Sequence, residues 1–140
     1  MSGWESYIAA IKEFGGESSA LVGKNGSVWF MSSDWESNRA ENEKTLLNLV
    51  KQYANEDEEG VADPYELRQH GVVLKPDPKY KIARVDKESG FAFGKGESKG
   101  LVIADFKQGL LIGAHGPKVS SENFNVRLTG LAKHLESSLP

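Results

Sequence analysis

The sequence predicts an α+β fold in which a single domain, residues 1–140, is built on a central antiparallel β-sheet with helices on both faces. Two observations predict the sheet. Short β-rich segments follow one another in the second half of the chain, and the connections between them are too short to hold crossover helices. A third observation predicts the helices: apolar residues recur at helical spacing at both ends of the chain and once between them.

The N-terminus predicts a short amphipathic helix. Ser2 and Glu5 have the spacing of a capping box, in which each side chain bonds a free backbone N–H of the other residue. The apolar residues that follow at helical spacing are Trp4, Tyr7, Ile8 and Ile11. The helix is expected to end near Phe14, before two glycines.

A β-hairpin is predicted next. Two short apolar runs, residues 20–23 and 27–30, flank the dipeptide Asn25-Gly26. Asn-Gly accepts the positive φ angles that a type I′ turn requires, so the two runs are expected to pair as antiparallel strands.

The middle of the chain predicts a second helix and an exposed loop. The helix is expected to run from Asn38 to Asn55, with one apolar face formed by Leu46, Leu47, Leu49, Val50 and Tyr53. Four adjacent carboxylates then mark residues 55–62 as a solvated loop, because like charges repel and resist burial. Asp63 is a good helix cap and precedes a proline, which predicts a brief helical turn through Leu67.

The remaining chain predicts a strand meander and a final helix. The expected strands are residues 71–74, 80–85, 91–93, 101–106 and 110–114. Ser120, Ser121 and Glu122 then form a cap and an acidic first turn. The apolar stripe of this last helix is Phe124, Leu128, Leu131, Leu135 and Leu139.

Composition limits the classes of protein that fit. The absence of cysteine excludes disulfides, thiolate metal sites and thiol nucleophiles. No apolar stretch is long enough to span a bilayer, and the N-terminus lacks the pattern of a signal peptide, so a soluble cytoplasmic protein is expected. The net charge of −3 conceals an acidic half, residues 1–74, and a basic half, residues 75–140. The sequence has no dense cluster of Lys and Arg, so nucleic-acid binding is not expected.

No motif predicts catalysis. His70, His115 and His134 lie in separate elements without a second ligand at metal spacing, so no metal and no cofactor are expected. Gly94-Lys95-Gly96 resembles a phosphate loop but precedes a strand, whereas such a loop requires a helix after it. The protein is therefore predicted not to be an enzyme.

Aromatic residues form the most informative pattern. Trp4 and Tyr7 share a helical face, Trp29 lies in the hairpin, and His134 joins them if the terminal helices pack together over that hairpin. Flat apolar rings with N–H and O–H donors suit a polyproline II ligand, whose carbonyls are exposed. The alternative is that these rings simply fill a small core.

The sequence resembles the profilin family along nearly its whole length. Each motif is short, but all occur in the order of the family. They are the start Ser2-Gly3-Trp4-Glu5-Ser6-Tyr7-Ile8, the strand Ser27-Val28-Trp29, Lys79-Tyr80 followed by Arg84, the hairpin Gly94-Lys95, the strand Gly109-Leu110-Leu111-Ile112-Gly113, and Asn125 with Leu131-Ala132-Lys133-His134-Leu135 in the last helix. The resemblance implies that the N- and C-terminal helices lie on one face of the sheet and the further helices on the other.

The resemblance also implies a function. A profilin binds monomeric actin, regulates its polymerisation, docks proline-rich segments of actin-assembly factors, and in many members binds phosphoinositides; it is cytoplasmic and cytoskeleton-associated. The polyproline groove would use Trp4, Tyr7, Trp29, His134 and Leu139. The actin face would use Arg84, Lys95, Val119, Ser120 and Asn125, with Lys81 and Lys99 as neighbours. A basic face would then meet a generally acidic actin surface.

Some positions depart from the family pattern and mark a divergent member. The chain ends Leu139-Pro140 where vertebrate profilins end in a groove-completing Tyr, which implies a shallower groove. Val126 and Gly130 stand where vertebrate members carry a Lys and a Glu, which removes two polar actin contacts. The acidic loop at residues 55–62 is surplus to the family pattern and is either an actin contact or a neutral insertion.

Two other functions remain open at this point. One is a proline-rich-peptide adaptor in which actin binding is weak or lost. The other is a small α/β ligand-sensing or scaffolding domain with only a similar layout. An open groove between Trp4 and Trp29 would favour a profilin, whereas a buried cavity between helices and strands would favour the sensing domain.

Overall fold

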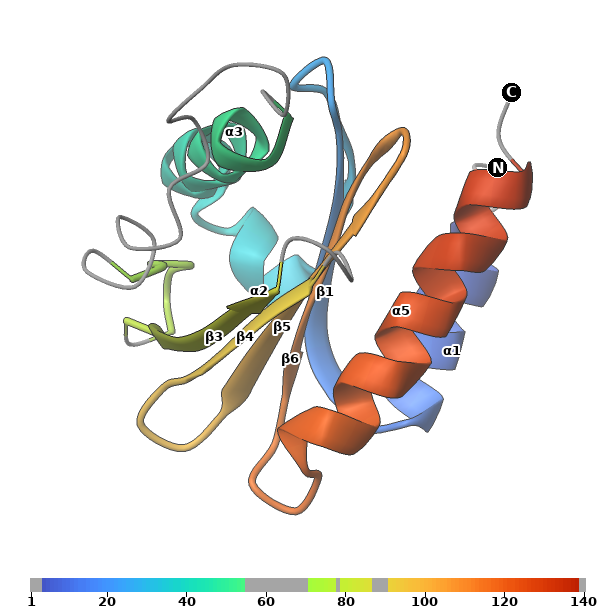
Figure 1. Cartoon of the computed structure of the whole chain (residues 1–140). Helices are drawn as coiled ribbons and strands as arrows, with labels where there is room; N and C mark the ends of the chain where they lie inside the picture. Colours follow the sequence, from blue (N-terminus) through green and yellow to red (C-terminus); the bar gives the residue numbers. More distant parts are fainter. Residues whose placement is uncertain (1–3, 55–70, 78, 87–90, 139–140) are drawn as a thin grey trace.

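The computed structural model describes residues 4–54, 71–77, 79–86 and 91–138 (Figure 1). Six strands form one sheet in the order β2-β1-β6-β5-β4-β3, and every neighbouring pair is antiparallel. They are β1 (Gly16–Gly23), β2 (Val28–Met31), β3 (Lys81–Asp86), β4 (Phe91–Lys95), β5 (Gly100–Phe106) and β6 (Gly109–His115). The predicted antiparallel α+β fold is confirmed.

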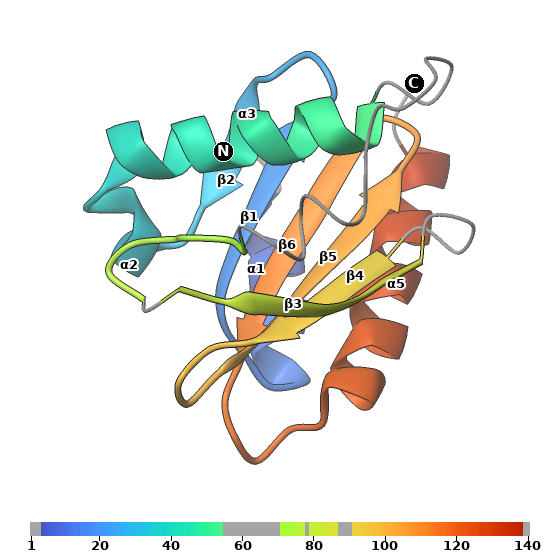
Figure 2. The ribbon, with the colours of Figure 1, turned by 60° about the vertical axis from the view of Figure 1, so that its left-hand side comes forward.

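Helices cover both faces of this sheet (Figures 1 and 2). The helices α1 (Glu5–Glu13) and α5 (Ser121–Ser138) lie side by side on one face, whereas α2 (Ser33–Glu36) and α3 (Arg39–Ala54) lie on the other. The two terminal helices therefore share a face, as the resemblance implies.

The central strands carry apolar side chains on both faces. Val102 and Leu111 belong to the core beneath α1 and α5, while Leu101 and Ile103 belong to the core beneath α2 and α3. Successive side chains of a strand point to opposite faces, so a sheet covered by helices on both sides needs apolar residues at every position. This explains the continuous apolar runs of β5 and β6 in the sequence.

The last helix begins as the sequence predicts. The Oγ atom of Ser120 accepts a hydrogen bond of 3.1 Å from the backbone N–H of Asn123, which is the bond expected of an N-cap. Phe124, Leu128 and Leu135 of the predicted stripe are buried against the sheet. Gly113 on β6 permits this close approach, since a Cβ atom there would lie 2.8 Å from Cζ of Phe124.

The first helix begins later than predicted. It starts at Glu5, and Trp4 occupies its N-cap position without a side-chain capping bond. Helical hydrogen bonding begins at Trp4, because the backbone N–H of Ile8 donates to the carbonyl of Trp4 at 3.0 Å. The predicted cap at Ser2 lies outside the described residues.

The β1–β2 hairpin forms, but with a different turn. The backbone N–H of Gly26 donates to the carbonyl of Gly23 at 2.9 Å, so Lys24 and Asn25 are the central residues of the turn. Gly26 follows with a φ of +91°. A three-residue loop, with a turn at Lys24 and Asn25 and then Gly26 in the positive-φ region, replaces the predicted two-residue type I′ turn. This loop needs only one residue with a positive φ, and Gly26 supplies it.

Two further elements differ from the prediction. The expected strand at residues 71–74 is reduced to an isolated antiparallel bridge between Val72 and Tyr80. The short helix α2 has too few residues to show a helical period and was not predicted. The acidic loop at 55–62 and the turn after Asp63 lie outside the described residues.

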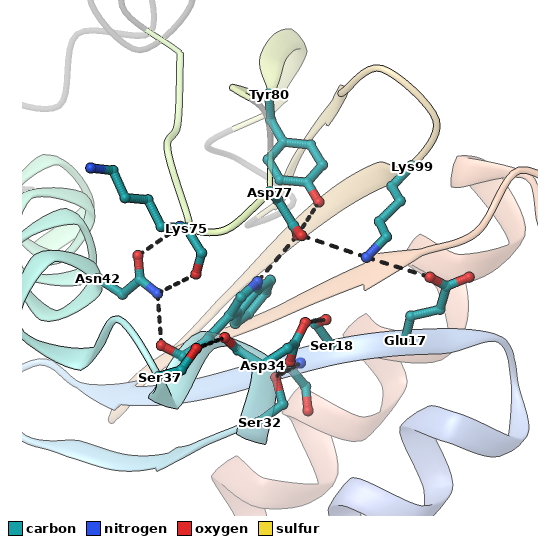
Figure 3. A network of polar contacts seen from close by, with 12 residues as sticks. Glu17, Ser18, Ser32, Asp34, Ser37, Asn42, Lys75, Asp77, Tyr80 and Lys99 are labelled. Atoms are coloured by element: carbon teal, nitrogen blue, oxygen red, sulfur yellow. Dashed lines mark hydrogen bonds and ion pairs between the residues drawn. The ribbon is translucent and has the colours of Figure 1, made fainter.

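A polar network fixes the segment around Val72 and Tyr80 to the α2–α3 side of the sheet (Figure 3). The side chain of Asn42, which is fully buried, accepts a hydrogen bond from the backbone N–H of Lys75 and donates one to its carbonyl, both at 2.8 Å. Its amide also donates to the carbonyl of Trp35 at 2.9 Å. One amide side chain thus replaces the strand pairing that this segment lacks.

Asp77 forms a second centre of the network. Its Oδ2 atom accepts hydrogen bonds from the indole N–H of Trp35 at 3.2 Å and from the hydroxyl of Tyr80 at 2.6 Å. Burial, followed by the hydrogen bond to Asp77, raises the pKa of Tyr80 well above its ordinary value. Tyr80 is therefore held as a neutral donor.

Candidate functional site

Four aromatic side chains from three elements meet on the α1–α5 face. Trp4 stacks on Trp29 of β2, with ring centroids 5.8 Å apart and planes 8° apart. Tyr7 of α1 follows, 5.9 Å from Trp4, and His134 of α5 lies 6.1 Å from Tyr7. We call Trp29, Trp4, Tyr7 and His134 the aromatic row. The structure thus brings together four of the five residues predicted for a polyproline groove; the fifth, Leu139, lies outside the described residues.

The side chains of the aromatic row are partly exposed and partly packed against the core. Trp4, Tyr7 and Trp29 are half-buried and pack against the core beneath α1 and α5, whereas His134 is exposed. Phe30 is buried and its ring lies 6.0 Å from that of Trp4, so it supports the row from below. The row therefore combines core packing with an exposed aromatic area that a ligand could contact.

A β-bulge places Trp29 in the row. In the β1–β2 pairing, Leu21 is opposite Phe30 and Val22 is opposite Val28, so Trp29 is the extra residue of β2. Strict alternation would direct Trp29 and Phe30 to opposite faces, whereas both pack against the α1–α5 core. The sequence carries no clear signal of this bulge, because bulges depend on strand register.

The residues predicted for an actin face lie at the other end of α5. A hollow of about 540 Å³ opens between the β4–β5 connection and residues 115–122. Four of the predicted residues line it: Lys95, Lys99, Val119 and Ser120. Asn125 lies farther along α5, where its Oδ1 atom accepts a hydrogen bond of 3.1 Å from the hydroxyl of Thr129.

The two remaining predicted residues lie on β3. Lys81 is exposed and opposite Lys95 in the β3–β4 register, so the two ammonium groups come from neighbouring strands. An irregularity between Ile82 and Arg84 brings Arg84 opposite Phe93. Of the seven predicted residues, four therefore line the hollow, two lie on β3, and Asn125 lies farther along α5.

Comparison with known proteins decides the family. The family model for profilin matches residues 2–139. The chain belongs to the profilin family. Profilin-1 of Entamoeba histolytica is 31% identical over 115 residues, which cover 79% of this chain and 77% of that protein. Schizosaccharomyces pombe profilin has the same fold, with a TM-score of 0.75 at 18% identity over 97% of this chain and 98% of that one.

Two solved complexes also share the profilin fold. LokiProfilin1, solved with rabbit actin, has a TM-score of 0.66 at 17% identity and covers 96% of this chain and 97% of its own. Mouse profilin IIa, solved with a double repeat from the FH1 domain of mDia1, has a TM-score of 0.66 at 17% identity, over 97% of this chain and 98% of that one.

The charge of the hollow differs from that expected for this profilin. Among the described residues that line it, Glu97 and Glu122 balance Lys95 and Lys99. The Nζ atom of Lys99 also lies 3.5 Å from carboxylate oxygens of both Glu17 and Asp77 (Figure 3). The excess of positive charge in the second half of the sequence is therefore not concentrated at this hollow.

His115 forms the buried wall of the same hollow. Its Nδ1 atom lies 2.9 Å from the carbonyl oxygen of Gly116 and its Nε2 atom lies 2.9 Å from the hydroxyl of Ser121. Both ring nitrogens thus have a partner, and the contact of Nε2 with Ser121 joins the end of β6 to the start of α5. Across the described residues, no three His, Asp or Glu side chains gather into a potential metal site.

Proposed function

We propose that this profilin binds monomeric actin and regulates its polymerisation, while docking proline-rich segments on the aromatic row. The observation that carries the proposal is the aromatic row itself, in a chain that belongs to the profilin family. The structural neighbours solved with rabbit actin and with an FH1 repeat support both parts.

The aromatic row suits a proline-rich ligand for a physical reason. A polyproline II helix is already extended before binding, so it loses little conformational entropy. Its prolyl rings pack against flat indole and phenol faces, and its carbonyls accept hydrogen bonds from the N–H and O–H groups of those rings. Leu139 is proposed to contribute to the same binding site.

The actin-binding surface is proposed to comprise Arg84, Lys95, Val119, Ser120 and Asn125, with Lys81 beside them. Lys99 belongs to the same region, but its ammonium group is already paired with Glu17 and Asp77. Carboxylates balance the lysines of the hollow, which disfavours phosphoinositide binding there.

The two surfaces are separate enough to be occupied together. His134 ends the aromatic row nine residues after Asn125 on α5, which corresponds to roughly 13 Å along the helix axis. A single domain would then hold an actin monomer and a proline-rich assembly factor at once, and so raise the local concentration of actin at that factor.

The proposal is tested with the full chain and two ligands. Spontaneous assembly of fluorescent actin should slow as the profilin is added, and a decaproline column should retain the protein. Trp4→Ala should abolish retention and leave the effect on assembly, because the row lies away from the proposed actin surface. No effect on assembly at about 50 µM protein, a ceiling for weak complexes, would contradict actin binding. Retention without that effect would favour the adaptor function.

A further inference from the structure

We propose that this profilin contacts actin chiefly through three apolar side chains, Phe93, Val119 and Val126, and only weakly through its lysines. This inference rests on the proposed actin binding. We call these three residues the apolar contact set.

Val126 is the first observation. It lies in the middle of α5 and is 69% exposed, the highest value among the large hydrophobic side chains of the described residues. The apolar residues around it in sequence, Phe124 and Leu128, are fully buried. A single exposed valine is common on protein surfaces. Val126 indicates a contact surface only if its neighbours in space are also apolar or belong to a proposed binding site.

Val119 connects Val126 to the proposed actin surface. A second hollow, of about 630 Å³, lies between the end of α1 and the start of α5, and Val126 lines it together with Phe14 and Arg127. Val119 and Ser120 line both this hollow and the one that contains Lys95. The segment before α5 therefore stands between two hollows and joins Val126 to residues already proposed to face actin.

Phe93 supplies the apolar side chain on the strand side. It lines the first hollow and is half-buried, with its inner part packed against the α1–α5 core. The ring of Phe91 stacks on it, with centroids 5.8 Å apart and planes 6° apart. Core packing and this stack hold the ring in place, so little side-chain entropy would be lost when a partner covers it.

The charged side chains around this surface are expected to contribute little to binding. Lys99 is paired within the molecule, and Glu97 and Glu122 offset the remaining lysine of the first hollow. Arg127 lies over the ring of Phe14, 5.7 Å from its centroid, and it lines the second hollow together with Lys118 and Glu13. Exposed charges in such mixed surroundings are screened by salt and contribute little, whereas burial of apolar side chains is insensitive to salt.

The partner that fits this surface is an actin monomer with an apolar patch at the contact. Substituting Val126 with Asp places a charge against that patch and should weaken binding at least about tenfold, because a buried unpaired charge is costly. Phe93→Ser should have a similar effect. Lys95→Glu should weaken binding by no more than about threefold.

The test is a titration of labelled actin monomers, kept from polymerising by a sequestering drug, with the wild-type protein and the three variants. The matched control is Leu47→Asp, because Leu47 is a 39% exposed apolar residue of α3 on the opposite side of the sheet. The control should bind as the wild type does. Wild-type affinity should change by less than about threefold between 20 and 150 mM KCl. Retention on decaproline confirms that each variant is folded.

Two outcomes would overturn the inference while leaving actin binding intact. One is unchanged affinity of Val126→Asp and Phe93→Ser. The other is a steep loss of wild-type affinity with salt, accompanied by a large effect of Lys95→Glu. Failure of the wild-type protein itself to bind actin would instead reject the proposed function.

Discussion

The indole rings of Trp4 and Trp29 lie nearly parallel, 8° apart with centroids separated by 5.8 Å, although one belongs to the start of α1 and the other to β2. The stack forms because a bulge gives β2 one residue more than its partner strand, and that residue is Trp29. Each indole thereby limits the motion of the other before any ligand arrives. A prearranged row binds an already extended ligand at low entropic cost.

Replacement of Trp29 tests this arrangement. Trp29→Ala should reduce affinity for a proline-rich peptide at least about tenfold, because it removes a ring of the row and the support of Trp4. Trp29→Tyr should restore most of the affinity, since it keeps a flat ring with one donor. Calorimetric titration with decaproline measures both, and equal losses in the two variants would contradict a role for the ring itself.

Intrinsic fluorescence provides the control for that experiment. Trp35 belongs to α2, on the other face of the sheet, where it is fully buried and donates its indole N–H to Asp77. A change in indole emission on adding decaproline must therefore come from Trp4 or Trp29. The change should vanish in the double variant Trp4→Phe, Trp29→Phe.

Asn42 should be among the most sensitive positions outside the cores. Asn42→Ala leaves the backbone N–H and carbonyl of Lys75 without the two bonds of 2.8 Å that now satisfy them. Loss of such buried bonds should lower the free energy of unfolding by about 2–4 kcal/mol. Urea denaturation measures this loss. Exposed Asn48 on the same helix is the matched control, and Asn48→Ala should change stability by less than about 0.5 kcal/mol.

The sequence predicts the elements of this fold better than their junctions. Apolar period and turn residues are local, and they correctly predict α1, α3, α5 and the strand meander. The bridge at Val72 could not be predicted, because its segment is held by Asn42, which is 33 positions from Lys75. Side-chain bonds between distant segments leave no periodic pattern.

The candidate site shows the same division. The spacing of Trp4 and Tyr7 on one helix, with the expected packing of the terminal helices over the hairpin, predicts all four residues of the row. Family resemblance adds Leu139, which lies outside the described residues. Phe30 beneath the row and Phe93 at the hollow were missed, since their exposure depends on strand register and on the packing of α5. Counting charges along the chain also misled, because Lys99 is paired with Glu17, which is distant in the sequence.

Tyr80 should make stability depend on alkaline pH. Burial and the hydrogen bond to Asp77 raise the pKa of Tyr80, so its folded form holds the proton more tightly than its unfolded form. This contribution is complete below the unfolded pKa of about 10 and is lost as pH rises toward the folded pKa. Tyr80→Phe should cost about 1–2 kcal/mol at pH 7 and flatten the decline in stability above about pH 10. Urea denaturation at a series of pH values measures this. An equally steep loss of stability at alkaline pH in Tyr80→Phe would show that other groups cause the loss.

Gly130 offers a route to a more stable protein. It lies within α5, and a Cβ atom there would meet nothing within 4 Å. Gly130→Ala should therefore raise the free energy of unfolding by about 0.5–1 kcal/mol, because alanine loses less backbone entropy in a helix. Gly113→Ala is the opposite case, since its Cβ atom would lie 2.8 Å from Cζ of Phe124 and push α5 from the sheet. Thermal unfolding of the two variants should thus shift in opposite directions, and a stabilised Gly113→Ala would mean that α5 packs less tightly than the structure indicates.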